Sequence, residues 1–241
     1  MAIYTSKTRI DLEDVGYSNK ITNKAILKIL ENAGARQSET IHFGLNDMEN
    51  VGFSWILLGW KVKILKRPIY NEELTINTWG RESNRIFTYR DYEIYDESGE
   101  LCTIATSKWA IVDINTGKLR ELTPEIIEKY QCETKKAFEE DYTLKLKEPA
   151  TIIRKQEYKA QRRDIDINKH IHNLYYLDYA YETLPEEVYE APECNNIEIM
   201  YKKQIRLNDE FKCLYTKEEN QNIVTMKSED ENTLHAIIKL Y

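Results

Sequence analysis

Residues 60–74 read WKVKILKRPIYNEEL, and residues 197–211 read IEIMYKKQIRLNDEF. Aligning Trp60 with Ile197 without a gap superposes alternating apolar positions, then an Asn, two acids and an apolar residue. Alternation of this kind is typical of half-buried strands. Similarity at a fixed spacing indicates that one folding unit occurs twice in the chain.

The segments around the two stretches follow the same order. In the first half, apolar residues at helical spacing predict a helix over residues 18–36, capped by Ser18 or Asn19, and strand-like runs occupy residues 51–113. Each half predicts one helix and an antiparallel sheet, an α+β architecture. In the second half we expect a strand at 151–160, a helix at 169–183, and strands at 197–206, 210–218, 222–228 and 233–240.

A segment without strand pattern separates the two halves. Residues 122–150 include a short predicted helix after Pro124 and end in a charged stretch closed by Pro149. We interpret this segment as a linker between an N-terminal unit, residues 1–121, and a C-terminal unit, residues 151–241. A sheet in a unit of this size can bury the apolar face of one helix.

The composition of the 241 residues argues against several classes of function. There are 34 Lys and Arg against 41 Asp and Glu, a net charge of −7, which disfavours a broad nucleic-acid-binding face. The run WILLGW at residues 55–60 is far shorter than the roughly 20 residues of a membrane span. The first 20 residues carry early acids and no apolar core, so we expect no targeting signal and a cytoplasmic protein.

The cysteines and histidines do not predict a metal or cofactor site. The cysteines lack CxxC spacing, which favours reduced thiols, and the histidines lack a ligand constellation. We therefore expect neither a metal nor an organic cofactor. The residues concerned are Cys102, Cys132, Cys194 and Cys213, and His42, His170, His172 and His235.

One polar run stands directly before the second predicted helix. Residues 162–173 read RRDIDINKHIHN, in which Asp166, Asn168 and His170 alternate. In an extended segment, side chains at this spacing project to the same side and can converge. A histidine can deprotonate water because its unperturbed pKa of about 6.5 lies near the working pH. Alternatively, Asp166 and Asn168 cap the helix and His170 has no chemical role.

The start of the second helix adds a further chemical element. The first N–H groups of a helix have no partner inside the helix and lie at the positive end of its dipole. They could polarise a carbonyl and stabilise the oxyanion that forms when water attacks it.

The polar run and the repeat resemble the acyl-acyl-carrier-protein thioesterases, the family of the plant fatty-acid chain terminators and their bacterial relatives. Residues 164–173, which read DIDINKHIHN, resemble the D-x-D-x-N-x-H-x-N-N pattern that members of that family carry before the second helix. The resemblance covers nearly the whole chain. It implies two tandem hotdog units, each an antiparallel sheet wrapped around a central helix, with acyl-chain binding in the first and catalysis in the second.

The resemblance also implies roles for single residues. It makes His170 the group that activates water, Asn168 the group that orients substrate or water, and Asp166 the group that holds the network. A fourth family position is a Glu after a Tyr and two basic residues, and residues 201–204 place Gln204 there. Glutamine can hydrogen-bond water but cannot accept a proton as glutamate does, so the role of base falls to His170.

Two further positions depart from the family pattern. Ile205 stands where some plant members carry a Cys, so nothing there supports a cysteine nucleophile, and the nearby Cys194 and Cys213 are expected to be buried and inert. His172 stands where an Asn is usual. It could add a second titrating group near the site, but we expect it to face solvent.

The resemblance predicts hydrolysis of fatty acyl thioesters on acyl carrier protein, with release of the free fatty acid. An acyl-coenzyme A thioesterase and a non-catalytic acyl-binding protein are alternatives. The glutamine at position 204, in place of the Glu that is usual in the family, favours the non-catalytic protein. Because acyl carrier protein is acidic, docking requires local basic surface, for which the candidates are Arg162, Arg163, Lys202 and Lys203. Alternatively, these cations form a solvated face that contacts no partner. Two units in one chain predict a monomeric pseudo-dimer or a homodimer.

Overall fold

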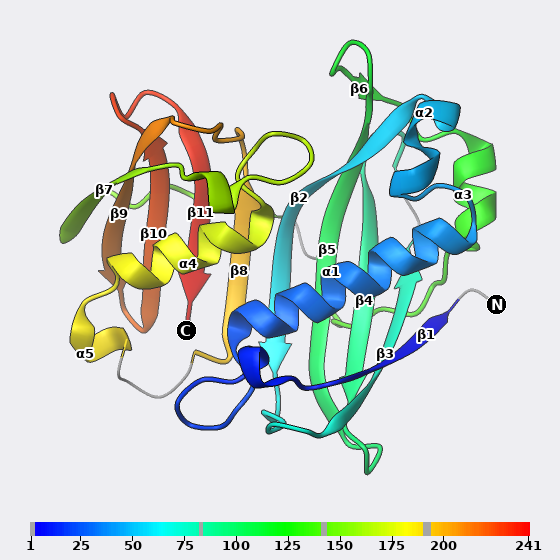
Figure 1. Cartoon of the computed structure of the whole chain (residues 1–241), viewed down its shortest axis with the longest axis horizontal. Coiled ribbons are helices and arrows are strands. Elements are labelled where there is room, and N and C mark those ends of the chain that lie inside the picture. The colour runs from blue at the N-terminus through cyan, green and yellow to red at the C-terminus, as the bar shows by residue number, and fades with distance from the viewer. Residues whose placement is uncertain (1–2, 82–83, 141–143, 190–193) are drawn as a thin grey trace. The chain divides into compact units, whose positions relative to one another are not determined.

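The computed structural model describes residues 3–81, 84–140, 144–189 and 194–241. The chain divides into two compact units, residues 1–142 and 143–241. Figure 1 labels their helices and strands. Within the described part of the chain, no helix is both long enough and apolar enough to cross a membrane.

The first unit consists of one long helix, α1 (Asn23–Thr40), and an antiparallel sheet with the strand order β1-β3-β4-β5-β2, in which β6 also pairs with β5. Its strands are β1 (Tyr4–Arg9), β2 (Phe53–Ile64), β3 (Glu73–Gly80), β4 (Thr88–Tyr95), β5 (Leu101–Asp113) and β6 (Leu119–Arg120). Its shorter helices are η1 (Leu12–Asp14), η2 (Leu45–Asp47), α2 (Met48–Val51) and α3 (Pro124–Tyr130).

The second unit repeats this arrangement with a shorter central helix, α4 (Asn173–Thr183). Its antiparallel sheet has the order β7-β9-β10-β11-β8, which matches the first sheet strand for strand. The remaining elements are β7 (Arg154–Lys159), η3 (Arg162–Asp164), α5 (Glu186–Tyr189), β8 (Asn196–Tyr201), β9 (Glu210–Glu218), β10 (Gln221–Ser228) and β11 (Leu234–Leu240).

The internal repeat predicted from the sequence extends to backbone geometry. Lys20 forms an isolated antiparallel bridge with Ile69, and His170 forms the corresponding bridge with Arg206. Two residues further on, Asn71 and Asn208 both have left-handed backbones, with φ of 71° and 70°. These positions correspond in the gap-free alignment of Trp60 with Ile197, so the α+β repeat is confirmed.

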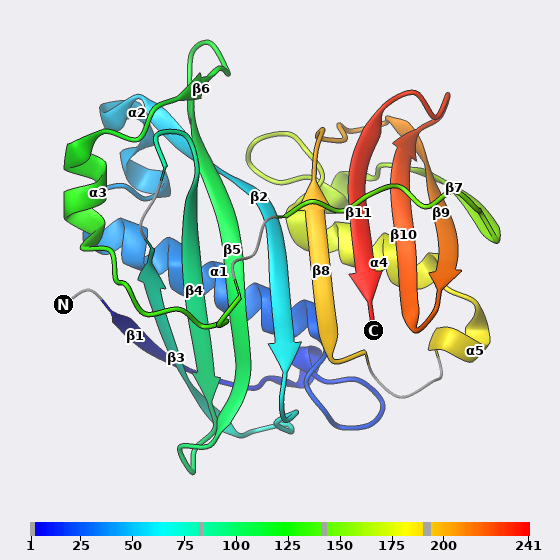
Figure 2. The ribbon, with the colours of Figure 1, turned by 180° about the vertical axis from the view of Figure 1, so that it is seen from behind.

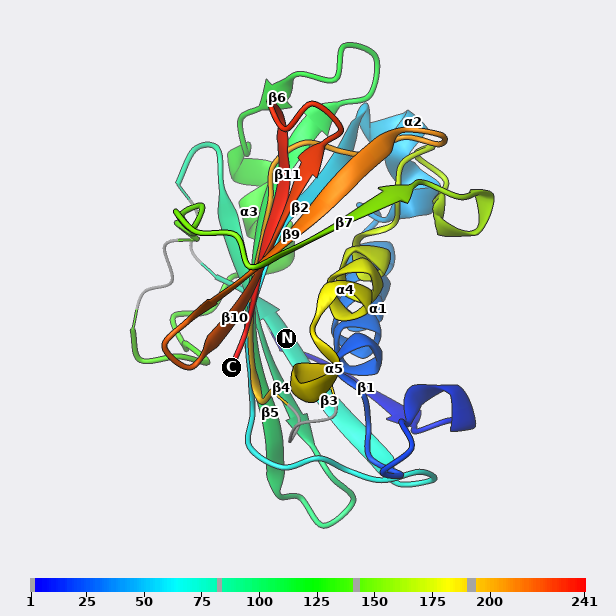
Figure 3. The same cartoon turned by 90° about the vertical axis from the view of Figure 1, so that its left-hand side faces the viewer.

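Each sheet packs against its own helix. In the first unit the buried face of α1 includes Ile26, Leu30 and Ala33, and Figure 2 views this sheet with α1 behind it. A Cβ added at Gly34 would lie 2.9 Å from the Tyr92 hydroxyl, so a glycine is needed for this close approach. In the second unit α4 lies against one face of its sheet (Figure 3) and buries Leu177.

The segment that we interpret as a linker contributes to the first unit. Its helix α3 follows Pro124, as predicted, and is capped by Thr123. A buried cluster joins α3 to the unit, so this part of the predicted linker packs with the first unit. Its members are Phe43, Phe53, Ile111, Leu122, Ile126 and Tyr130.

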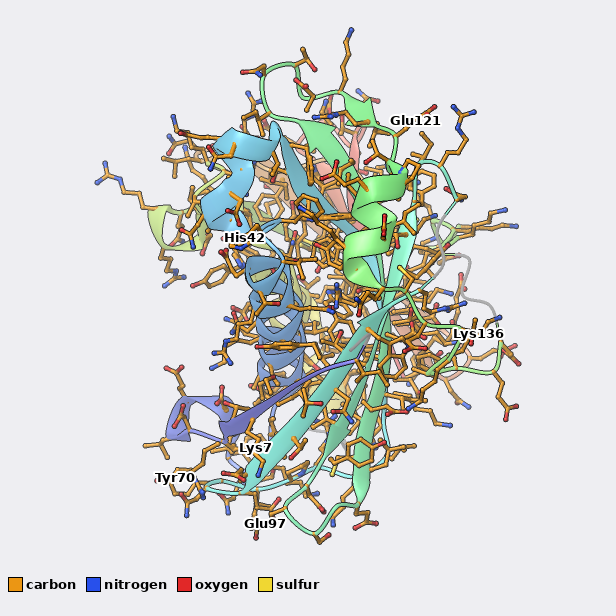
Figure 4. The ribbon with its side chains drawn as sticks, turned by 90° about the vertical axis from the view of Figure 1, so that its right-hand side faces the viewer. Lys7, His42, Tyr70, Glu97, Glu121 and Lys136 are labelled. Carbon is orange, nitrogen blue, oxygen red and sulfur yellow. The ribbon has the colours of Figure 1, made fainter. Side chains whose placement is uncertain are left out.

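The chain after α3 covers the side of the first sheet away from α1, where Figure 4 labels Lys136. Ala137 N–H donates to the buried carboxylate of Asp91 at 2.8 Å. The Trp79 indole donates to the Lys135 carbonyl, also at 2.8 Å. These bonds attach the covering segment to β3 and β4.

Several boundaries predicted from the sequence are wrong. Helix α1 is capped by Thr22 rather than by Ser18 or Asn19, because residues 15–21 close a turn through the bridge between Val15 and Ile21. The second helix starts at residue 173 rather than 169, because the bridge between Ile165 and Ile171 closes the corresponding turn. The strand predicted over 197–206 ends at Tyr201.

We predict that Leu177→Ala destabilises the second unit by about 2–5 kcal/mol, because it removes a fully buried side chain between α4 and the sheet. Thermal unfolding of the whole chain measures the loss. Ile152→Ala, at a residue that is 49% exposed, is the control and should change stability by less than about 0.5 kcal/mol. Equal effects of the two substitutions would contradict this packing.

Candidate functional site

Asp166, Asn168 and His170 lie in one tight turn rather than in the extended segment that their alternation predicts. The Asp166 N–H donates to the His170 carbonyl at 2.9 Å, and the Lys169 N–H donates to the Asp166 carbonyl at 3.0 Å. Lys169 has a left-handed backbone, with φ of 63°. The turn brings the three predicted residues together.

The carboxylate of Asp166 holds this turn. Its Oδ1 accepts the backbone N–H groups of Asn168, at 2.8 Å, and of His170, at 3.3 Å. A side chain that accepts amides of its own turn replaces backbone bonds that the turn cannot make. The Asn168 side chain is exposed, and its Nδ2 lies 3.5 Å from Asp166 Oδ2.

His170 is half-buried beside the turn, where its electrostatic surroundings are mixed. Burial lowers the pKa of its imidazole; the Asp166 carboxylate opposes this shift, Arg206 adds to it, and Asp209 opposes it. The net shift is downward, because a charged ring is disfavoured where water is excluded. A lowered pKa keeps the ring neutral at pH 7, the form that accepts a proton.

Helix α4 begins directly after the turn and is capped by His172, not by Asp166 or Asn168. His172 Nδ1 accepts the Leu174 N–H at 3.3 Å, and the side chain, which we expected to face solvent, is half-buried. The capping interpretation of Asp166 and Asn168 is wrong, because His172 occupies the cap position. Within the described residues the Asn173 N–H has no hydrogen-bond acceptor, which leaves one donor at the positive end of α4 available.

Gln204 lies on the segment that runs antiparallel to the end of the turn. The Ile171 N–H donates to the Ile205 carbonyl at 2.8 Å, and His170 bridges Arg206. In this register Gln204 lies opposite His172, with an exposed side chain. All four residues predicted to be catalytic are thus on two adjoining segments of the second unit.

Sequence reasoning did not identify two residues that support the turn. Asp164 is buried, and its carboxylate accepts the Tyr179 hydroxyl at 2.5 Å and the Gln161 N–H at 2.8 Å. Its carbonyl accepts the His172 N–H at 2.8 Å. Burial and the Asp164 carboxylate raise the pKa of Tyr179, which therefore stays a hydrogen-bond donor. The recurrence of Asp14 at the same place in the first half was the available signal.

Tyr176 connects helix α4 to the Gln204 segment. Its buried hydroxyl accepts the Ile205 N–H at 3.3 Å. Its ring packs edge-on against Tyr201, whose hydroxyl donates to the Asn173 carbonyl at 3.1 Å. Helix, turn and segment are therefore held by both backbone and side-chain contacts.

The first unit has the same turn without these side chains. Gly16 N–H donates to the Lys20 carbonyl at 3.0 Å, and Ile21 N–H donates to the Pro68 carbonyl at 3.0 Å. Gly16, Ser18 and Lys20 occupy the positions of Asp166, Asn168 and His170. Arg67 takes the place of Gln204 and donates to the Ile21 carbonyl and to Asn23. The first unit thus keeps the backbone and lacks the chemical groups.

Other predicted groups lie outside this cluster. Burial raises the pKa of the Cys213 thiol to about 12, which opposes its use as a nucleophile. Among the described residues, no three His, Cys, Asp or Glu side chains are grouped so as to hold a metal ion. The predicted docking cations are exposed: Arg162 and Arg163 in η3, and Lys202 and Lys203 after β8.

Comparison with known proteins identifies matches to both units. Residues 1–130 match the family model described as acyl-ACP thioesterase N-terminal domain. Residues 147–239 match the model described as acyl-ACP thioesterase C-terminal domain.

The chain is also similar to individual proteins. It is 25% identical over 238 residues, 92% of its length, to oleoyl-acyl carrier protein thioesterase 2, chloroplastic, from Arabidopsis thaliana, and spans 65% of that relative. It is also 25% identical to oleoyl-acyl carrier protein thioesterase 1, chloroplastic, from the same plant, and spans 63% of the length of that relative. In fold it resembles an acyl-ACP thioesterase from Bacteroides thetaiotaomicron, with a TM-score of 0.87 and 22% identity over 99% of this chain and 97% of that one. A 12:0-ACP thioesterase from Umbellularia californica has a TM-score of 0.87 at 17% identity, covering 100% and 96% of the two chains.

We predict that NMR titration gives His170 a pKa below about 6.5, because burial disfavours the charged ring. Asp166→Asn should lower the pKa further, since it removes the nearby negative charge that favours the protonated form. Asn is close in size to Asp, and its side-chain oxygen can still accept the N–H groups of the turn. The variant therefore removes the negative charge while it keeps the backbone of the turn. A His170 pKa at or above 6.5, or a rise in the variant, would contradict this assignment.

We predict that Tyr179→Phe destabilises the second unit by about 1–3 kcal/mol, because the buried Asp164 carboxylate loses a donor. Backbone amides of residues 166–170 should then exchange hydrogen faster. Tyr189→Phe, at an exposed tyrosine of the same unit, is the control. Unchanged exchange in the turn would show that the Tyr179 hydroxyl does not support it.

Proposed function

Because the chain belongs to the acyl-ACP thioesterase family, we propose that it hydrolyses fatty acyl thioesters of acyl carrier protein and releases the free fatty acid. The observation that carries this proposal is the turn of Asp166, Asn168 and His170 at the start of α4. We further propose that the first unit, which lacks these groups, binds the acyl chain.

In the proposed reaction the neutral His170 imidazole accepts a proton from a water molecule while the water oxygen attacks the thioester carbonyl carbon. The carbonyl π electrons move to oxygen, and the Asn173 N–H at the positive end of α4 stabilises this oxyanion. The tetrahedral intermediate reforms its carbonyl and expels the thiolate. The thiolate takes the proton from His170, which returns the neutral base.

The other residues of the turn have positioning roles in this proposal. Asp166 fixes the backbone through the amides of Asn168 and His170, so its carboxylate is not the base. The exposed Asn168 amide orients water or substrate. Gln204, opposite His172, can hydrogen-bond the attacking water but cannot take its proton.

Gln204 also supports a second function, a non-catalytic acyl-binding protein. In that function the chain binds the acyl thioester without hydrolysing it, because the carboxylate that is usual in the family at position 204 is absent. An acyl-coenzyme A thioesterase would use the same turn with another carrier, so the carrier must be varied in the test.

We predict that the wild-type chain releases fatty acid from acyl-acyl-carrier-protein thioesters of differing chain length. His170→Ala should reduce kcat by at least about 100-fold, since it removes the general base. Gln204→Glu should retain or increase kcat. His42→Ala, at an exposed histidine of the first unit, is the matched control and should leave kcat unchanged (Figure 4).

Each contrary outcome has its own meaning. Binding of acylated carrier protein without release, reversed by Gln204→Glu, would favour the acyl-binding function. Preferential hydrolysis of acyl-coenzyme A would overturn the choice of carrier. Full activity of His170→Ala would overturn the proposed base.

A further inference from the structure

The corner of the second unit that contains the turn differs in charge from its repeat. This corner comprises residues 161–172 and 202–209, which are joined by the hydrogen bond between Ile171 and Ile205. It carries six Lys or Arg and three Asp, a net charge of +3. The matching residues of the first unit, 11–22 and 65–72, carry three Lys or Arg and four acids, a net charge of −1.

The cations of this basic corner are exposed and available. Within the described residues, five of the six form no ion pair, and the sixth, Arg163, has its Nε 3.7 Å from Asp164 while remaining 76% exposed. The five are Arg162, Lys169, Lys202, Lys203 and Arg206. In the first unit, by contrast, Lys66 pairs with Asp96 and Glu100, and Arg67 donates within its own corner.

The three acids of the basic corner are engaged in internal contacts. Asp164 is buried on Tyr179, Asp166 accepts amides of the turn, and Asp209 Oδ2 accepts the Arg206 N–H at 2.8 Å. The outward field of the corner is therefore positive in a chain whose net charge is −7.

Two apolar side chains lie among these cations. Ile167, at the tip of the turn, is 65% exposed, and Leu207 is 38% exposed. Their counterparts in the first unit are Tyr17 and Tyr70, the latter labelled at the outer edge of that unit in Figure 4. The basic corner thus combines apolar anchors with a charged rim, the usual composition of a protein-binding surface.

We infer that the basic corner is the docking surface for the acidic face of acyl carrier protein, with Ile167 and Leu207 contacting apolar residues between the acids of that partner. This inference rests on the proposed function and deepens it. It adds Lys169 and Arg206 to the cations predicted from the sequence. The cations are spread over η3, the turn and the 202–206 segment, which suits an extended acidic surface better than a single phosphate group.

Docking on this surface delivers the acyl thioester to the turn. Exposed charge pairs mainly accelerate association and are screened by salt, with a Debye length of about 10 Å at 0.1 M. Binding of the carrier should therefore weaken steeply as salt rises, whereas hydrolysis of a thioester without a carrier should not.

The test is a charge reversal on both flanks of the corner, Arg162→Glu with Lys203→Glu, in the whole chain. We expect the double variant to bind acylated carrier protein at least tenfold more weakly in low salt and to lose most of the salt dependence. Hydrolysis of an acyl-N-acetylcysteamine thioester, which has no carrier, should stay within twofold of wild type. Lys217→Glu, at an exposed lysine on β9 of the same unit, is the control.

The readouts separate the two proposals. Equal carrier binding by the double variant and wild type would overturn the docking surface, whatever the hydrolytic activity. An equally large loss of acyl-coenzyme A turnover would also overturn it, by assigning the cations to the phosphates of the coenzyme. If wild type hydrolyses no thioester at all, the proposed function fails, and direct binding of the carrier still decides the docking surface.

Discussion

The hydrogen bond from the Ile171 N–H to the Ile205 carbonyl, 2.8 Å long, is the contact on which the arrangement of the candidate site depends. It joins segments that are far apart in the chain and sets their register. His170 then bridges Arg206, and Gln204 lies opposite His172. Tyr176 supports the same junction from α4 by accepting the Ile205 N–H. The site therefore depends on one backbone junction that is supported from the helix.

The first unit has the same junction, from the Ile21 N–H to the Pro68 carbonyl, and yet lacks the chemical groups. The turn is closed in both units by the same backbone bonds, and in the first unit a glycine, Gly16, stands at the position of Asp166. Arg67 then fills the position of Gln204 with a cation that is used internally. Fold and function are separable, because the junction is made by the backbone and the chemistry by side chains.

The charged side chains around the turn of the second unit have opposing effects on the pKa of His170. Asp166 and Asp209 engage backbone amides and at the same time raise the pKa of His170, while burial and Arg206 lower it. Burial dominates, so the imidazole is a neutral base near pH 7. The acids accept amides or the Tyr179 hydroxyl, and six exposed cations outnumber three acids, so the charge around the turn is positive. The same contacts thus hold the turn of the proposed base, His170, and leave the corner with a positive surface.

The sequence by itself determined the duplicated α+β architecture and the identity of the polar run. Both follow from side-chain period and from a specific order of residue types, which are local properties. It also placed the candidate catalytic residues in the second half, because the first half has no D-x-N-x-H spacing. Its family assignment agrees with the matches over both units.

Only the tertiary structure decided that the polar run is a turn, that His172 caps α4, and that Asp164 is fastened to Tyr179. The same alternation of polar residues occurs in strands and in tight turns, so it does not distinguish them. Which residue caps α4 depends on the residue at which the turn closes. The partners of Ile171 and Asp164 are distant in the sequence, so no local pattern reports them. Helix α3 joined the first unit for a similar reason, since the apolar residues that it covers come from other segments.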